Sequence, residues 1–166
     1  MGSGKSTLGR LVSKTTGLDF IDLDQYIENR FHSTVRDLFN ERGEEGFRQI
    51  ERNMLHEVAD MENVIIACGG GTPCFFDNME HINTSGTSVL LEAPLEILHS
   101  RLLRGQYKRP LIASLSSEEL KEFIIKALAE REPFYSKAQH RFNTALLERE
   151  AERQETAQRF INTFME

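Results

Sequence analysis

The sequence predicts a three-layer α/β domain built on a parallel sheet. Segments with helical periodicity alternate along the chain with short apolar runs, a pattern typical of parallel strands covered by helices on both faces. In addition, glycine or acidic residues follow directly on two of the apolar runs, where ligands bind in open α/β sheets. We expect the 166 residues to form one domain, 1–166.

Composition excludes several classes of protein. Hydrophobic residues make up 39% and charged residues 28%, which are ordinary values for a globular chain. No apolar run approaches a membrane span, no signal peptide is visible, and a net charge of −6 argues against nucleic-acid binding. Cys68 and Cys74 lack the companion ligands of a zinc site. We therefore expect a cytoplasmic monomer with neither a membrane nor a nucleic acid as partner.

A phosphate-binding loop is expected at the start of the chain. Gly2–Thr7 reads Gly-Ser-Gly-Lys-Ser-Thr and leads into an amphipathic helix over 5–16. In such a loop backbone N–H groups cradle phosphates, Lys5 reaches the β and γ phosphates, and Ser6 offers its hydroxyl to Mg²⁺. The full motif would place its first glycine two positions before Met1. We therefore expect the polypeptide to begin upstream, with the first strand absent from this sequence. A flexible Gly/Ser-rich tail is the alternative.

Two aspartates follow the first apolar run. Residues 18–24 predict a buried strand that carries Asp22 and Asp24 at its carboxyl end, both on one side. Asp22 is then placed to organise Mg²⁺ through water, and Asp24 to accept a proton from an attacking hydroxyl or to orient it. Capping of a helix over 25–30 would explain one of the two aspartates.

An arginine lies beside the apolar face of the next long helix. A short helix capped by Thr34 is followed by a second helix over 47–61. Arg48 lies at the margin of its apolar stripe, where it can reach the edge of a cleft. A solvated ion pair with Glu44 or Glu51 is the alternative role.

Three consecutive glycines end the second predicted strand. Residues 64–67 are apolar, and Gly69, Gly70 and Gly71 follow one residue later. Such a run is costly in backbone entropy unless a ligand must approach the chain closely. We therefore expect a substrate to lie on these N–H groups.

The rest of the chain continues the alternation. We expect helices over 75–82 and 94–103, a strand over 87–92 and a loop over 105–116 that contains Arg109. A charged loop closing over phosphates would bring Arg109 to the transferring group, whereas an exposed linker is the other interpretation.

A cation continues an apolar stripe in the helix expected over 117–131. Leu120, Ile124 and Ala127 recur at steps of three or four, and the next step of four reaches Arg131. A cation on a buried face needs a partner or a ligand. Pro133 is expected to end this helix, and a strand over 141–143 and a helix that packs through Ala157, Phe160, Ile161 and Phe164 complete the chain.

Taken together, these motifs resemble the shikimate kinases over nearly the whole chain. The resemblance is carried by Gly-Ser-Gly-Lys-Ser-Thr at 2–7, Asp22-x-Asp24, Phe47-Arg48-x-x-Glu51, Val64-Ile65-Ile66-Ala67-Cys68-Gly69-Gly70-Gly71, Arg109-Pro110-Leu111 and Arg131-x-Pro133-x-Tyr135. It implies a P-loop kinase fold with a five-stranded sheet in the order 2-3-1-4-5. It also implies transfer of the γ-phosphoryl group of ATP to the 3-hydroxyl of shikimate, in aromatic amino-acid biosynthesis, with Mg²⁺ as cofactor.

The resemblance also implies roles for individual residues. ATP would be bound by Gly2, Ser3, Gly4, Lys5, Ser6, Thr7 and Arg109, and Mg²⁺ by Ser6 and Asp22. Shikimate would be bound by Asp24, Arg48, Gly69, Gly70, Gly71 and Arg131, with Lys5, Asp24 and Arg109 catalytic. The contact to adenine is left open between Arg101 and Arg104.

Two other functions remain open on the sequence. A different P-loop small-molecule kinase, such as a gluconate kinase, would share the phosphate loop but has no evident need for Arg48 and Arg131 beside three glycines. A truncated, non-catalytic module that binds nucleotide or substrate is the second alternative.

Overall fold

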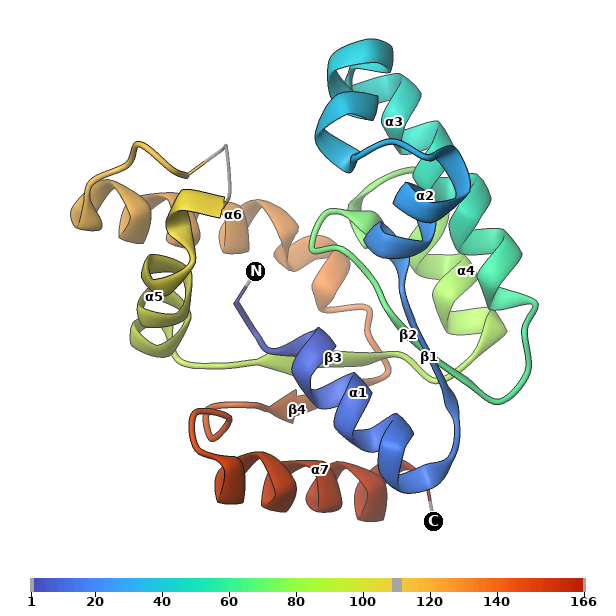
Figure 1. Ribbon diagram of the computed structural model, residues 1–166, viewed down its shortest axis with the longest axis vertical. Helices are drawn as coiled ribbons and strands as arrows, with labels where there is room; N and C mark the ends of the chain where they lie inside the picture. The colour runs from blue at the N-terminus through green and yellow to red at the C-terminus, as the bar shows by residue number, and fades with distance from the viewer. Residues whose placement is uncertain (1, 109–111, 166) are drawn as a thin grey trace.

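Seven α-helices surround two pairs of short parallel strands in the computed structural model, which describes residues 2–108 and 112–165 (Figure 1). The elements in chain order are α1 (Lys5–Thr16), β1 (Asp19–Asp22), α2 (Leu23–Phe31), α3 (Val35–Ala59), β2 (Val64–Ala67), α4 (Asn78–Ser85), β3 (Val89–Glu92), α5 (Leu95–Arg104), α6 (Ser117–Tyr135), β4 (His140–Asn143) and α7 (Glu150–Phe164). Short 3₁₀ turns occupy Thr72–Cys74 and Gln106–Lys108.

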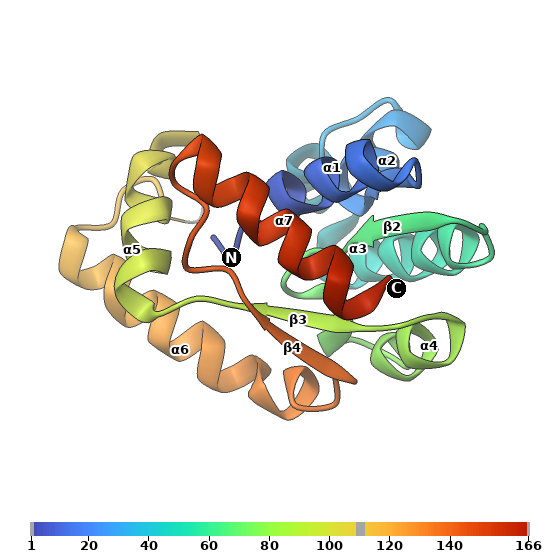
Figure 2. The same cartoon turned by 90° about the horizontal axis from the view of Figure 1, so that it is seen from below.

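The strands pair in parallel, as the alternation of elements predicts. β1 pairs with β2, with Asp22 opposite Ala67, and β3 pairs with β4, with Glu92 opposite Asn143. In the expected order 2-3-1-4-5, strands 2 and 3 correspond to β1 and β2, and strands 4 and 5 correspond to β3 and β4. The two pairs form separate sheets in the described part of the chain. Figure 2 shows α1 and α7 on one side of the strands and α4 and α6 on the other, which gives the three expected layers.

The first helix has the predicted bounds. Its N-terminal neighbour Gly4 has a φ of 88°, and Gly17 after its last residue has a φ of 79° and donates its N–H to the carbonyl of Ser13. Leu8 and Val12 are almost fully buried and pack with Phe142 and Ala157. Because those partners belong to β4 and α7, the C-terminal part of the chain supports the helix that begins at the phosphate loop.

The boundary between β1 and α2 differs from the predicted one. The strand stops at Asp22, and Leu23 already begins the helix. Leu23 and Ile27 are both fully buried, so helical spacing places them in the same core, and this packing overrides the strand pattern. Asp24 consequently lies in the first turn of α2 rather than at the end of a strand.

Other boundaries also shift. Thr34 caps α3 as predicted, accepting the N–H of Asp37 at 3.1 Å, and the predicted break between two helical segments is present at Gly43, whose φ is 69°. The second segment resumes directly after Gly43 rather than at residue 47. The helix predicted from 75 starts only at Asn78, after the 3₁₀ turn. The prediction that Pro133 ends α6 is wrong: the helix continues to Tyr135, whose hydroxyl donates to the carbonyl of Gly70 at 2.6 Å.

Candidate active site

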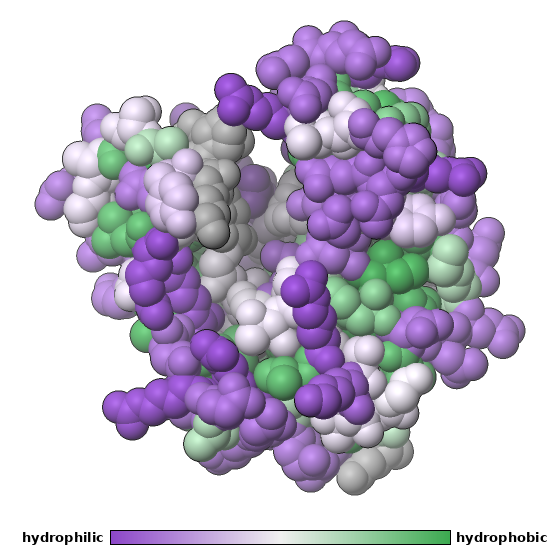
Figure 3. Space-filling view, in the orientation of Figure 1, coloured by the Kyte–Doolittle hydropathy of each residue, from purple (hydrophilic) through white to green (hydrophobic). Residues whose placement is uncertain are grey.

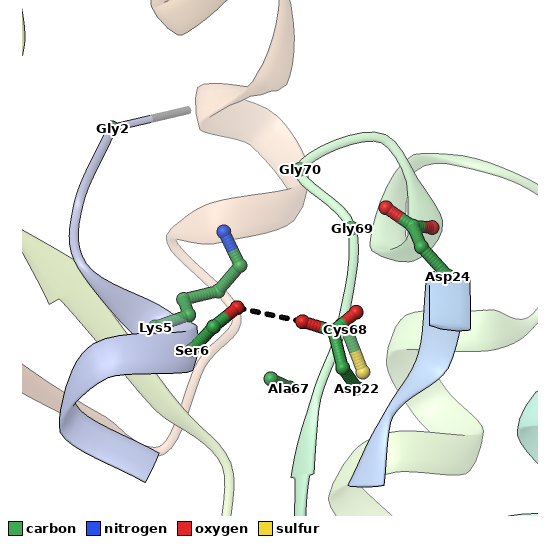
Figure 4. Close-up of a pocket in the computed structure, with 9 residues that line it drawn as sticks. All are labelled: Gly2, Lys5, Ser6, Asp22, Asp24, Ala67, Cys68, Gly69 and Gly70. Carbon is green, nitrogen blue, oxygen red and sulfur yellow. Dashed lines mark hydrogen bonds between the residues drawn. The ribbon is translucent and has the colours of Figure 1, made fainter. Parts of the chain in front are cut away.

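A pocket of about 230 Å³ lies where α1 begins and where β1 and β2 end. In the space-filling view the molecule is hollowed between its α5–α6 side and its α2–α3 side (Figure 3). The close-up shows the lining residues, which are Gly2, Lys5, Ser6, Asp22, Asp24, Ala67, Cys68, Gly69 and Gly70 (Figure 4). Seven of the fourteen residues predicted for phosphate, metal and substrate binding therefore line one cavity.

The start of the chain has the backbone of a phosphate-binding loop. Gly2 and Gly4 adopt φ angles of 67° and 88°, a region that L side chains rarely enter. A Cβ on Gly4 would also overlap the side chain of Leu147. The φ angle therefore favours glycine at position 4, and the side chain of Leu147 packs where a Cβ would lie.

The side chain of Lys5 extends into the pocket (Figure 4). Burial lowers the pKa of its ammonium group, while the negative charges of Asp24 and Asp22 oppose that shift. The nearby Cys68 thiol is not a nucleophile at neutral pH, since burial raises its pKa to about 12. Among the residues that line the pocket, Lys5 carries the cationic side chain.

Ser6 and Asp22 form a pair of oxygen donors. The hydroxyl of Ser6 donates to Asp22 Oδ2 at 2.6 Å (Figure 4). Both groups are hard oxygen ligands, which fit Mg²⁺, an ion that commonly keeps several waters and takes further oxygens from a phosphate. Among residues 2–108 and 112–165 no cluster of three or more His, Cys, Asp or Glu forms a metal cage. The donor set therefore suits a cation that arrives with a nucleotide.

Asp24 lies across the pocket from Lys5 (Figure 4). Although its side chain remains open to solvent, partial burial of the carboxyl raises its pKa, and the charges of Asp22 and Glu51 raise it further. The charge of Lys5 acts in the opposite direction. A Cβ on Gly69 would lie 3.5 Å from Asp24 Oδ1, which places this carboxylate beside the glycine turn. A raised pKa makes Asp24 a better proton acceptor.

Arg48 is fixed against the glycine turn by a buried carboxylate. Glu51 is 1% exposed; it accepts from Arg48 Nη1 at 2.8 Å and from Thr72 Oγ1 at 2.6 Å. A Cβ on Gly71 would lie 2.8 Å from Arg48 Nη2, so a side chain there would displace the guanidinium. The ion pair between Arg48 and Glu51 is therefore present, in agreement with one of the two roles that the sequence suggests. It is buried rather than solvated, and it directs Arg48 toward the glycine turn.

Arg131 reaches the same turn from α6. Its charge lowers the pKa of Tyr135 against the effect of burial, and the Tyr135 hydroxyl donates to the carbonyl of Gly70. The positive charges of Arg131 and Arg48 both lower the pKa of the Cys74 thiol against the effect of burial. Arg48 from α3 thus lies against Gly71, and Arg131 from α6 acts together with it on Cys74, which follows the glycine turn.

The family model for shikimate kinase matches residues 1–164. The chain belongs to the shikimate kinase family. A shikimate kinase from Phocaeicola vulgatus is 55% identical over 148 residues, which cover 89% of this chain and 85% of that protein. The crystal structure of shikimate kinase from Bacteroides thetaiotaomicron matches with a TM-score of 0.95 at 49% identity, over 98% of this chain and 93% of that one. Shikimate kinase from Acinetobacter baumannii in complex with shikimate matches with a TM-score of 0.83 at 29% identity, over 98% and 87% of the two chains.

Within this shikimate kinase family member, six of the described residues predicted for the site do not line the pocket, namely Ser3, Gly4, Thr7, Arg48, Gly71 and Arg131. Thr7 is exposed on α1, and Ser3 is buried with its carbonyl engaged by the hydroxyl of Thr144. Arg109 lies outside the described residues. The lid predicted over 105–116 is described only at its two ends, where Gln106 donates to the carbonyls of Ile112 and Leu115.

Sequence reasoning missed two supports of the site. Thr72 bridges Glu51 to the glycine turn, and Arg101 is turned toward the backbone of Gly2 rather than free to face a base. Nothing local marks either residue, because their partners are distant in sequence. Of the two arginines left open for adenine, Arg104 is the more exposed, and it pairs with Glu148.

No helix in the described ranges is both long and apolar enough to cross a membrane.

Proposed function

We propose that this chain transfers the γ-phosphoryl group of ATP to the 3-hydroxyl of shikimate, giving ADP and shikimate 3-phosphate, as a step of aromatic amino-acid biosynthesis. The observation that carries the proposal is the convergence of Arg48 and Arg131 on the glycine turn beside the phosphate loop. A small polyol that carries a carboxylate suits this arrangement. Membership of the shikimate kinase family supports it independently.

In the proposed mechanism the loop holds the nucleotide. Its N–H groups and Lys5 contact the β and γ phosphates, and the ammonium group spreads the charge that develops during transfer. Ser6 and Asp22 would hold Mg²⁺, which supplies positive charge to the phosphate oxygens when it is bound. The sequence-based role of Arg109 in a lid over 105–116 is part of the same proposal.

Shikimate is oriented by the opposite wall. Arg48 and Arg131 pair with its carboxylate, and Asp24 accepts a hydrogen bond from the 3-hydroxyl. As the hydroxyl oxygen bonds to the γ phosphorus, the bond from that phosphorus to the bridging oxygen of ADP breaks, and the hydroxyl proton passes to Asp24. The raised pKa of Asp24 suits it to this last step.

A substrate panel tests the function. Purified protein with ATP and Mg²⁺ is assayed for ADP release with shikimate, with gluconate and without acceptor. We expect release to depend on shikimate, and Lys5→Ala to lower kcat by about two orders of magnitude or more. Turnover with gluconate instead would favour the rival kinase. Binding of both ligands without turnover would favour a non-catalytic module.

A further inference from the structure

The outer side of the phosphate loop is held by residues for which the proposed mechanism has no role. These are Arg101 in α5 and residues 144–148 of the segment that joins β4 to α7. In the sequence they lie about a hundred or more positions from the loop, yet they contact its backbone directly.

Arg101 ties the loop to that segment through one guanidinium group. Its side chain is 12% exposed, and Nη1 donates to the carbonyl of Gly2 at 3.2 Å. Nη2 donates to the carbonyls of Thr144 and Ala145 at 2.8 and 3.1 Å, and Nε donates to Glu148 Oε1 at 2.8 Å. A guanidinium is planar and rigid, so these contacts fix the two segments relative to each other.

The 144–148 segment adds two contacts of its own. The hydroxyl of Thr144, which is fully buried, donates to the carbonyl of Ser3 at 2.7 Å. The side chain of Leu147 occupies the space that a Cβ on Gly4 would need. Two successive loop carbonyls are therefore hydrogen-bonded on the same outer side.

The direction of those carbonyls determines the direction of the N–H groups. In a trans peptide unit the carbonyl of one residue and the N–H of the next point to opposite sides. With the carbonyls of Gly2 and Ser3 held by Arg101 and Thr144, the N–H groups of Ser3 and Gly4 point away from those two residues. Neither Arg101 nor Thr144 lines the pocket, whereas Gly2 and Lys5 do.

We propose that Arg101 is a positioning residue for ATP, which together with Thr144 holds two peptide units of the phosphate loop so that their N–H groups donate to phosphate. This inference rests on the proposed function, since it concerns the nucleotide of that reaction. Arg101 does not touch the substrate in this arrangement. Its effect is on nucleotide affinity and is carried through the loop backbone.

The matched control is Arg153, which holds the same segment from the other side. It donates to the carbonyls of Leu147 and Glu148 at 2.9 and 3.1 Å, and no contact with the loop is among its hydrogen bonds or ion pairs in the described residues. Arg101→Met is expected to raise KM for ATP roughly tenfold and to leave KM for shikimate within about twofold. Arg153→Met is expected to leave both constants within about twofold, even where it lowers Tm.

A selective rise in KM for ATP is the result that a merely structural role would not give. If Arg101→Met lowers only Tm or kcat, or if Arg153→Met raises KM for ATP equally, the positioning role is wrong. Should Arg101→Met fail to fold, Thr144→Val decides. It removes one hydroxyl at nearly constant volume and is expected to raise KM for ATP several-fold, and an unchanged value overturns the proposal.

Calorimetric titration of ATP into the same proteins separates this inference from the proposed function. If wild type binds ATP but phosphorylates no shikimate, the proposed function fails. The Kd for ATP of Arg101→Met, or of Thr144→Val, compared with that of wild type, still decides the role of Arg101. Weaker binding by the variant supports the role, and equal binding overturns it.

Discussion

At the scale of single residues, substitution of Arg131 most directly tests the acid-binding end of the site, which is the part proposed to bind the carboxylate of shikimate. A charge-assisted pair with a carboxylate is lost in Arg131→Ala, so KM for shikimate is expected to rise roughly 10- to 100-fold while KM for ATP changes little. Initial rates with each substrate varied in turn measure both constants. Arg141→Ala is the control, because Arg141 is exposed and pairs only with Glu92 and Glu132 among the described residues. Equal rises in the two constants would contradict the carboxylate role.

Asp24 is expected to serve activity at some expense of stability. Its pKa is raised in the folded protein by partial burial and by Asp22 and Glu51, so the ionised form is disfavoured there relative to the unfolded chain. Above the folded pKa this lowers stability, and the penalty disappears as the pH falls through the folded pKa toward the ordinary value of 3.8. Asp24→Asn mimics the protonated form and should therefore raise Tm at pH 7 while lowering kcat.

The pH dependence makes that prediction sharper. The advantage in Tm of Asp24→Asn over wild type should shrink as the pH is lowered toward the ordinary carboxyl pKa of 3.8, because wild type takes up the proton before that pH is reached. In wild type, kcat should fall over the same range, since a protonated Asp24 accepts no proton. A Tm difference that is constant with pH would indicate that the substitution acts through packing instead.

Residue chemistry was the part of the site most readily predicted from sequence. Arg131 stood out because a cation continued an apolar stripe, and it is partly buried beside the glycine turn. Arg48 was placed at a margin, and the structure turns it inward because Glu51 and Thr72 complete its surroundings. The hydrophobic pattern of a helix can identify an arginine that needs a partner, but the identity of that partner depends on the tertiary fold.

At the scale of elements, α3 carries both the guanidinium and the carboxylate that holds it. Glu51→Gln leaves a neutral amide facing Arg48 in a buried place, so it is expected to lower the free energy of unfolding by about 3 kcal/mol, as measured by urea denaturation. KM for shikimate should rise as well, because Arg48 loses its orientation. Glu44→Gln is the matched control: Glu44 pairs with the same arginine at 3.7 Å but is 65% exposed, so it should change stability by no more than about 1 kcal/mol. Comparable losses from the two variants would show that burial of the pair is not important.

Element boundaries were harder to predict than the elements themselves. The alternation of strand and helix was predicted correctly, but β1 ended two residues early because Leu23 and Ile27 pack as helical neighbours. Likewise α6 passed through Pro133, where the contact of Tyr135 with Gly70 lies beyond the predicted end. In both cases tertiary packing decided a boundary that local propensity had left nearly balanced.

At the scale of the whole molecule, the pocket is assembled from segments that are far apart in sequence. Parallel pairing of β1 with β2 brings Asp22 and the glycine turn to one edge, as the fold class predicts. The contacts that hold the phosphate loop from behind, from Arg101 and Thr144, could not be predicted, because they join the first residues to positions about 100 and 140 residues later. Long-range hydrogen bonds of this kind leave no periodic signal.

The nucleotide-binding and shikimate-binding parts of the pocket can be tested separately by measuring how much each ligand raises Tm. A ligand that binds only the folded protein at about 100 times its Kd adds about 2.7 kcal/mol, which for a chain of this length raises Tm by roughly 5–10 °C. Shikimate alone is expected to raise Tm of wild type and of Lys5→Ala but not of Arg131→Ala. ADP with Mg²⁺ is expected to raise Tm of wild type and of Arg131→Ala but not of Lys5→Ala. Loss of the shikimate effect in Lys5→Ala would mean that the phosphate loop and the shikimate-binding residues form one coupled site, since shikimate binding would then depend on a residue assigned to the nucleotide.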